Sequence, residues 1–267
     1  MQGESGSAPS VWSLHHSIAQ LSCGPFAGAL DVARPHVGLH QPAFDHADVP
    51  CTFLCVSRGA DSNAAPMSDA ERERSWWPLP VAESYVRGDD LVATYGPIEA
   101  WPYSPQIYWR ANTLQLVDGV LGSLSLLLSV QTHLLDTHPQ INVVSQVPSS
   151  ECMHITYDSD GTAEVARVDA EQSRAPSGAM SAVLYRLLHD DFSYVEIMRA
   201  TEHRGITFRP TPAGKLHAEW ELFADFLEKG VIRRARVHGA LLPRENDIEL
   251  ALECCRAIEQ SPLPLTT

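Results

Sequence analysis

Residues 85–110, YVRGDDLVATYGPIEAWPYSPQIYWR, gather side chains that can bind a small molecule. Aromatic residues make up only 7% of the whole chain, so this segment is a local concentration. Aromatic rings can stack on the C–H groups of a sugar ring, and charged neighbours can hydrogen-bond its hydroxyl groups. The segment therefore predicts a ligand-binding wall made of Arg87, Trp101, Tyr108, Trp109 and Arg110.

The same segment also suits a protein interface. Proline-rich aromatic stretches brace sheet edges and join subunits in homo-oligomers. The two interpretations differ in burial. A ligand wall leaves Trp101 or Trp109 partly exposed in a concave site beside Arg87 or Arg110, whereas an interface buries them across a flat, self-complementary patch.

A second candidate lies in residues 231–242, VIRRARVHGALL, which have the pattern of a strand. Strand alternation places Arg234, Arg236 and His238 on one face. Guanidinium and imidazole groups in a row can receive a carboxylate or a phosphate. Such a row can equally be solvated or pair with acids on the next strand. A small anionic ligand is therefore one of two interpretations of this strand.

Metal and cofactor chemistry receives little support. His36, His40 and His46, with Asp45 and Asp48, form the densest group of potential ligands, but the His-x-His spacing of zinc sites on sheets is missing. The Walker A, GxGxxG, HExxH and GxSxG signatures are also missing, so we predict no metal, no cofactor and no assignable catalytic residue.

Glu219 and Glu221 flank Trp220 in the sequence HAEWELF. On a helix the two carboxylates point to different sides and make a poor acid–base pair. On a strand they share one face, and a two-carboxylate site becomes conceivable.

Bulk composition limits the partners. The 267 residues are 44% hydrophobic and 19% charged, as in an ordinary globular protein with a large core. The net charge of −14, with no basic block, disfavours nucleic acids and anionic membranes. Residues 1–10 are expected to be flexible. They lack the pattern of a signal peptide, and this favours a cytoplasmic protein. The six cysteines are expected to be buried thiols.

Most of the chain has the pattern of short strands. We predict strands at 11–26, 52–57, 81–87, 91–95, 106–113, 141–147, 153–158, 162–168, 181–188, 192–200 and 231–244, with hairpin turns at 88–90, 159–161 and 189–191. Residues 122–133 are ambiguous, but leucines alternating with serines favour a strand.

Two helices are predicted near the C-terminal end. Leu216, Trp220, Phe223 and Leu227 have helical spacing, which predicts a helix at 216–228. Residues 246–260 predict a second helix, with Asn246 as its N-cap. The expected fold is mainly β: one large antiparallel β-sandwich domain over residues 11–267, with a loop at 58–80 and a helical part at 214–267.

The opening strand VWSL, followed by a small-residue turn and LDVARPHVGL, resembles the start of galactose-mutarotase-like proteins. These are large antiparallel supersandwiches that handle sugars. The resemblance covers the architecture and the segment up to His40. It implies a carbohydrate or sugar-phosphate cleft with residues 85–110 on its wall. The Asn-His-x-x-Phe-Asn segment of active mutarotases is missing, so their catalytic residues are not carried over. The alternative is a non-enzymatic interaction protein that uses residues 85–110 as an oligomer interface.

Overall fold

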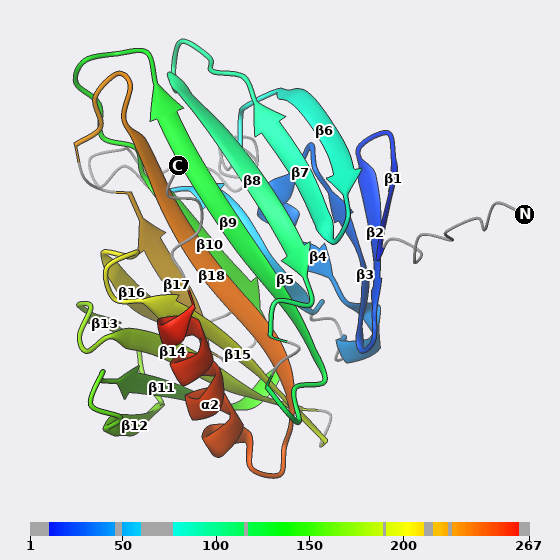
Figure 1. The fold of residues 1–267 in the computed structure, drawn as a ribbon, viewed down its shortest axis with the longest axis vertical. Helices are drawn as coiled ribbons and strands as arrows, with labels where there is room; N and C mark the ends of the chain where they lie inside the picture. The colour runs from blue at the N-terminus through cyan, green and yellow to red at the C-terminus, as the bar shows by residue number, and fades with distance from the viewer. Residues whose placement is uncertain are drawn as a thin grey trace, which may run out of the picture.

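The computed structural model describes residues 11–45, 50–59, 77–114, 117–188, 191–210, 216–223 and 226–261. Two antiparallel sheets of nine strands each form a β-sandwich (Figure 1). The first sheet has the order β1 (Trp12–His15), β2 (Ile18–Cys23), β3 (Phe26–Asp31), β4 (Leu39–His40), β5 (Thr52–Arg58), β10 (Ile141–Gln146), β17 (Leu216–Leu222), β16 (Gly205–Pro210) and β13 (Gln172–Arg174).

The second sheet has the order β12 (Ala163–Val168), β11 (Ser149–Tyr157), β14 (Met180–Leu187), β15 (Phe192–Arg199), β18 (Ile232–Pro243), β9 (Gly122–Thr132), β8 (Tyr103–Ala111), β7 (Asp90–Tyr95) and β6 (Val81–Arg87). Short 3-10 turns, η1 (Pro35–Val37) and η2 (Pro42–Phe44), lie on either side of β4. The predicted antiparallel sandwich is confirmed.

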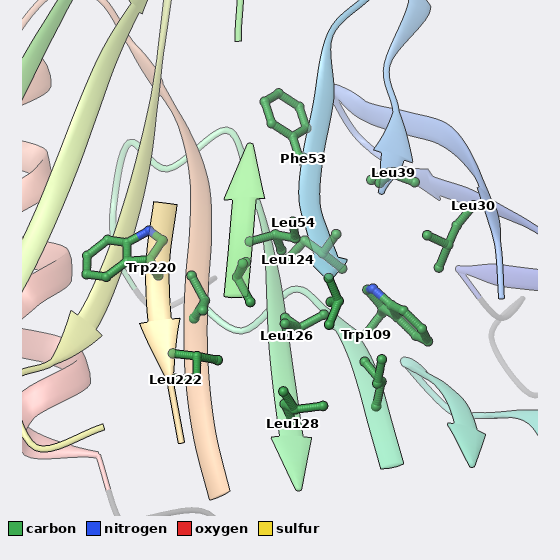
Figure 2. Close-up of a cluster of buried hydrophobic side chains, with 14 of the residues drawn as sticks. Leu30, Leu39, Phe53, Leu54, Trp109, Leu124, Leu126, Leu128, Trp220 and Leu222 are labelled. Carbon is green, nitrogen blue, oxygen red and sulfur yellow. The ribbon is translucent and has the colours of Figure 1, made fainter. Parts of the chain in front are cut away.

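The main core lies between the sheets. In Figure 2, Trp109, Leu124, Leu126 and Leu128 of the second sheet join Phe53, Leu54, Trp220 and Leu222 of the first in one buried cluster. Strand alternation explains this membership, because every second residue of β9 points inward. The ambiguous segment 122–133 is indeed a strand, since β9 pairs with β8 on one side and with β18 on the other.

A smaller core covers the outer face of the second sheet. The helix α2 (Asp247–Gln260) packs across β14, β15 and β18 (Figure 1). Its Ala251, Cys254, Cys255 and Ile258 are buried against this face. The predicted helix at 246–260 is confirmed. Asn246 occupies the predicted N-cap position, but it is left-handed, with φ of 62°, and its side chain makes no capping hydrogen bond.

The helix predicted at 216–228 is wrong. Residues 216–222 form strand β17, which pairs with β10 and β16. Ala218, Trp220 and Leu222 point into the core at intervals of two, as in a strand. The sequence pattern was ambiguous because Trp220 also belongs to a set of apolar residues with helical spacing. Pairing with two neighbours outweighs the weak helical preference of a single segment. The chain then turns at Phe223, whose φ is 55°.

The six cysteines are free and buried, as expected. Burial raises the pKa of Cys152 and Cys254 to about 12, so both remain protonated thiols at neutral pH. Among the described residues, no helix is long and apolar enough to cross a membrane.

Replacing Trp109 by alanine should lower the free energy of unfolding by about 3–5 kcal/mol, because a large, fully buried side chain leaves a cavity. The neighbouring Tyr108 points to the other face and is only partly buried, so Tyr108→Ala serves as the control and should cost clearly less. Denaturant unfolding of both variants measures the difference. Equal losses would contradict the placement of Trp109 between the sheets.

Candidate functional site

Three neighbouring strands of the second sheet bring two separately predicted groups together. In the register of β8, β9 and β18, Tyr108 lies opposite Leu127, which lies opposite Arg236. Two residues further along β8, on the same face, Arg110 lies opposite Ser125, which lies opposite His238. All these side chains stand on the outer face, away from the main core. The aromatic segment and the arginine–histidine row therefore form one surface.

This surface is the floor of a cavity of about 320 Å³. The opposite wall consists of Leu114 and Val117 together with the last turn of α2. The lining residues are Tyr108, Arg110, Thr113, Leu114, Val117, Ser125, Leu127, Arg236, His238, Ala257, Ile258 and Ser261. Charged and hydroxyl groups from the strands thus face an apolar wall from the loop and the helix.

His238 is a buried polar residue of the floor, with only 4% of its surface exposed. Its Nδ1 lies 2.6 Å from the Ser125 hydroxyl, which is 2.7 Å from the Thr113 hydroxyl. Its Nε2 is buried without a hydrogen-bond partner. Burial holds the pKa of His238 far below its usual range, and the nearby Arg236 and Arg199 lower it further. The imidazole is therefore neutral at physiological pH.

Arg236 supplies a half-buried positive charge to the floor. Its main-chain N–H donates to Glu202 Oε2 at 2.7 Å, and its side-chain Nε has no partner. Burial lowers the pKa of Arg236, and the negative charge of Glu202 opposes that shift. The guanidinium group is partly desolvated and keeps a donor available.

Arg199 holds the end of α2 over the sheet. Its Nη2 donates to the carbonyls of Ile258, Glu259 and Ser261 at 2.6, 3.1 and 2.8 Å. The C-terminal end of a helix carries partial negative charge and exposed carbonyls, which favour such a cation. The helix wall of the cavity is therefore fixed by one arginine of β15.

Arg110 lies at the open side of the cavity. Its Nε and Nη2 donate to the two carboxylate oxygens of Asp90 at 2.6 and 2.8 Å. The side chain is still 54% exposed. The Tyr108 hydroxyl donates to Gln106 Oε1 at 2.9 Å, so its oxygen can still accept a hydrogen bond. This side of the cavity offers polar contacts without a second unpaired charge.

The residues of the predicted ligand wall do not all lie on one surface. Trp109 is fully buried and Trp101 is 3% exposed, so neither can stack on a ligand. Alternation explains Trp109, because it points away from the face that carries Tyr108 and Arg110. Trp101 packs edge-on against Trp77 and Tyr103, with ring centroids 5.4 and 5.5 Å apart.

Two further predicted residues lie outside the cavity lining. Arg87 is exposed at the end of β6, close enough to influence the pKa of Tyr108. Arg234 lines a separate hollow of about 50 Å³ with His203, Glu202 and neighbouring residues. Of the eight residues predicted to bind a ligand, the cavity unites Tyr108, Arg110, Arg236 and His238.

Several lining residues were not predicted. The alternating serines of β9 signalled Ser125, because a serine between leucines on a strand faces away from the core. Thr113, Leu114 and Val117 lie in a connection with no distinctive pattern. Arg199 also gave no signal, since its partners are carbonyl groups about 60 residues further along the chain.

The other candidate clusters do not form comparable sites. Within the described ranges, no group of three potential metal ligands lies close together. His40 Nε2 is 3.1 Å from Asp45, while His46 and Asp48 fall outside those ranges.

Glu219 and Glu221 do share one face, because their segment is a strand. Each has local partners, however. Glu219 accepts hydrogen bonds from Asn142 and Arg209, and Glu221 accepts one from Thr207. These contacts are those of a polar sheet surface.

A buried acid lies between the sheets. Glu196 is fully buried and accepts hydrogen bonds from Ser145, from Tyr194 and from Trp220 Nε1 at 2.7 Å. Burial raises the pKa of Glu196, and the three hydrogen bonds oppose that rise. Its surroundings are core side chains, so its role is structural.

No protein-family model matches this chain, and no curated protein matches it. Among solved structures, one described as "Putative kojibiose phosphorylase from human microbiome" is similar with a TM-score of 0.45 and 8% sequence identity. The similarity covers 95% of this chain and 37% of that chain, so this chain spans well under half of that protein. The functional argument therefore rests on the site itself.

The stability of the protein should depend on pH through Glu196. A pKa raised in the folded state means that the folded protein binds this proton more tightly than the unfolded chain does. Its contribution is fully present below the glutamate pKa of the unfolded chain, about 4.3, and is lost as pH rises through the folded value.

The variant Glu196→Gln removes this titration and keeps the shape, since both hydroxyl partners can rotate to accept from the amide. Denaturant unfolding at several pH values should show that the native protein loses stability relative to the variant as pH rises. A difference that is constant with pH would contradict the raised pKa.

Proposed function

We propose that the protein binds a small organic anion, of the size of a sugar phosphate or a sugar acid, in the cavity between β8, β9, β18 and α2. One observation carries this proposal: Arg236 Nε and His238 Nε2 are both buried without a partner beside the same cavity. Buried polar groups in folded proteins nearly always have partners, so two unpaired groups at one cavity point to a ligand.

An anion would satisfy both groups. If the Ser125 hydroxyl donates to His238 Nδ1, the proton of the neutral ring lies on Nε2, which then donates to the ligand. Thr113 can donate to Ser125, so the hydroxyl chain and the imidazole are aligned as successive donors. Arg236 adds a charge-assisted hydrogen bond, which is stronger than a neutral one.

The size and walls of the cavity suit this class of ligand. About 320 Å³ lies at the lower end of the range for small-molecule sites. The apolar wall of Leu114, Val117 and Ile258 would pack on the carbon skeleton. The Tyr108 oxygen and Arg110 would contact hydroxyl groups near the opening. The proposal concerns binding and assigns no catalytic step.

The second candidate function was a non-enzymatic interaction protein with the 85–110 segment as an oligomer interface. Such an interface would need exposed aromatic anchors. Trp101 and Trp109, the largest candidates, are already buried within the protomer. No feature of this segment therefore favours the interface over the cavity.

Arg236→Gln should weaken binding of an anion about 10- to 100-fold, the equivalent of one charge-assisted hydrogen bond. The matched control is Arg234→Gln, on the same face of β18 but outside the cavity lining, which should change affinity much less. Isothermal titration calorimetry with glucose 6-phosphate and glucuronate measures both. Equal effects of the two variants would point to a general surface charge effect and against this cavity.

A further inference from the structure

The charges around the cavity determine which anion fits. Three guanidinium groups lie near one another here. The charges of Arg199 and Arg110 lower the pKa of Arg236, and the charges of Arg236 and Arg199 lower the pKa of His238. Two carboxylates oppose them. Asp90 is bound by Arg110, and Glu202 accepts from the main chain of Arg236 and lies 3.9 Å from Arg199. Three positive charges against two negative ones leave one positive charge while His238 is neutral.

Other charges lie at the rim. The charges of Arg87 and Arg234 act to lower the pKa of Tyr108, and the charge of Asp89 acts to raise the pKa of Arg110. These three side chains are on the solvent side, where water and salt screen them. The residues of α2 that line the cavity, Ala257 and Ile258, are apolar. Beyond them, the helix end offers carbonyl groups, which Arg199 binds, and the uncharged Ser261 hydroxyl, which accepts from Arg236 Nη2 at 3.4 Å. The buried part of the site therefore keeps a single excess positive charge.

We infer that the site selects a monoanion, the carboxylate of an organic acid, and that it accepts a dianionic phosphate ester only with the uptake of a proton. This inference rests on the proposed function and specifies its ligand class. One carboxylate balances the single excess charge, and its two oxygens can accept from Arg236 and His238 together. A phosphate dianion would leave one buried negative charge uncompensated, which is costly in a partly desolvated cavity.

Proton uptake is the route by which a phosphate ester could still bind. Either His238 or the phosphate group itself can take the proton, because a phosphate monoester has its second pKa near 6. Burial holds the pKa of the His238 imidazole well below its usual range, which makes this uptake unfavourable at alkaline pH. Affinity for a phosphate ester should then fall as pH rises from 6 to 8, while affinity for the matching carboxylate should stay nearly constant.

Matched pairs of ligands provide the test. Glucuronate and glucose 6-phosphate differ mainly in the charged group on a similar ring, and hexanoate and hexyl phosphate form an apolar pair. Calorimetry at pH 6 and pH 8, in two buffers of different ionisation enthalpy, gives both affinity and protons taken up. We expect the carboxylate of at least one pair to bind at least about 10-fold more tightly than its phosphate at pH 8, with a smaller gap at pH 6.

Charge variants make the test specific. Glu202→Gln keeps an oxygen for the Arg236 main chain but raises the charge of the cavity by one, so the phosphate should bind at pH 8 without proton uptake. Asp90→Asn raises the charge at the open side and serves as a second variant if Glu202→Gln does not fold. In either variant the preference for carboxylate should shrink or reverse.

The outcomes separate the two proposals. A phosphate ester that binds at pH 8 as tightly as its carboxylate, with no proton uptake, overturns the monoanion inference and leaves the anion site intact. Binding of none of the four anions, or binding that Arg236→Gln does not weaken, overturns the proposed function and this inference with it.

Discussion

The alternation of side chains along β8, β9 and β18 is the constraint on which the rest of the structure depends. One set of alternate residues, including Trp109, Leu126 and Val237, fills the main core. The other set, including Tyr108, Ser125 and Arg236, forms the floor of the cavity. A shift of one residue in the register would bury charges and expose the core leucines. Core packing therefore also fixes the positions of the candidate binding groups, although none of these groups belongs to the main core.

The outer face of the second sheet is divided between two uses. Along β18, Ala240 and Leu242 pack under α2, whereas Arg236 and His238 remain beyond the end of the helix. The cavity thus begins where the apolar stripe of β18 gives way to polar residues. Arg199 fixes this boundary, because it binds three carbonyl groups at the C-terminal end of α2. Arg199 thus adds a polar tie at the helix end to the apolar packing of Cys255 and Ile258, and the two together set the helix wall of the cavity.

Local sequence patterns predicted most strands correctly. The features that they failed to predict depend on pairing between strands that are far apart in the sequence. The hairpins at 88–90 and 159–161 appear where turn residues separate alternating segments, because both the turn and the pairing are local. The helix predicted at 216–228 failed because pairing of β17 with β10 and β16 cannot be seen in the segment itself. The arginine–histidine row of β18 was predicted on the correct face. Its position two strands away from Tyr108 follows from a pairing between residues more than 100 positions apart.

The energetic cost of the site is an argument for its function. Arg236 is partly desolvated, and His238 is buried and neutral with an unpaired nitrogen, and both conditions lower stability. Apolar residues of similar volume at these positions would extend the small core under α2, as Ala240 and Leu242 do further along the same strand. The main core, in contrast, satisfies its own buried acid, Glu196, with three donors. The buried acid of the main core thus has its hydrogen bonds made within the protein, whereas the half-buried Arg236 and the buried His238 each keep an unpaired nitrogen beside one cavity, which is the arrangement expected of a binding site.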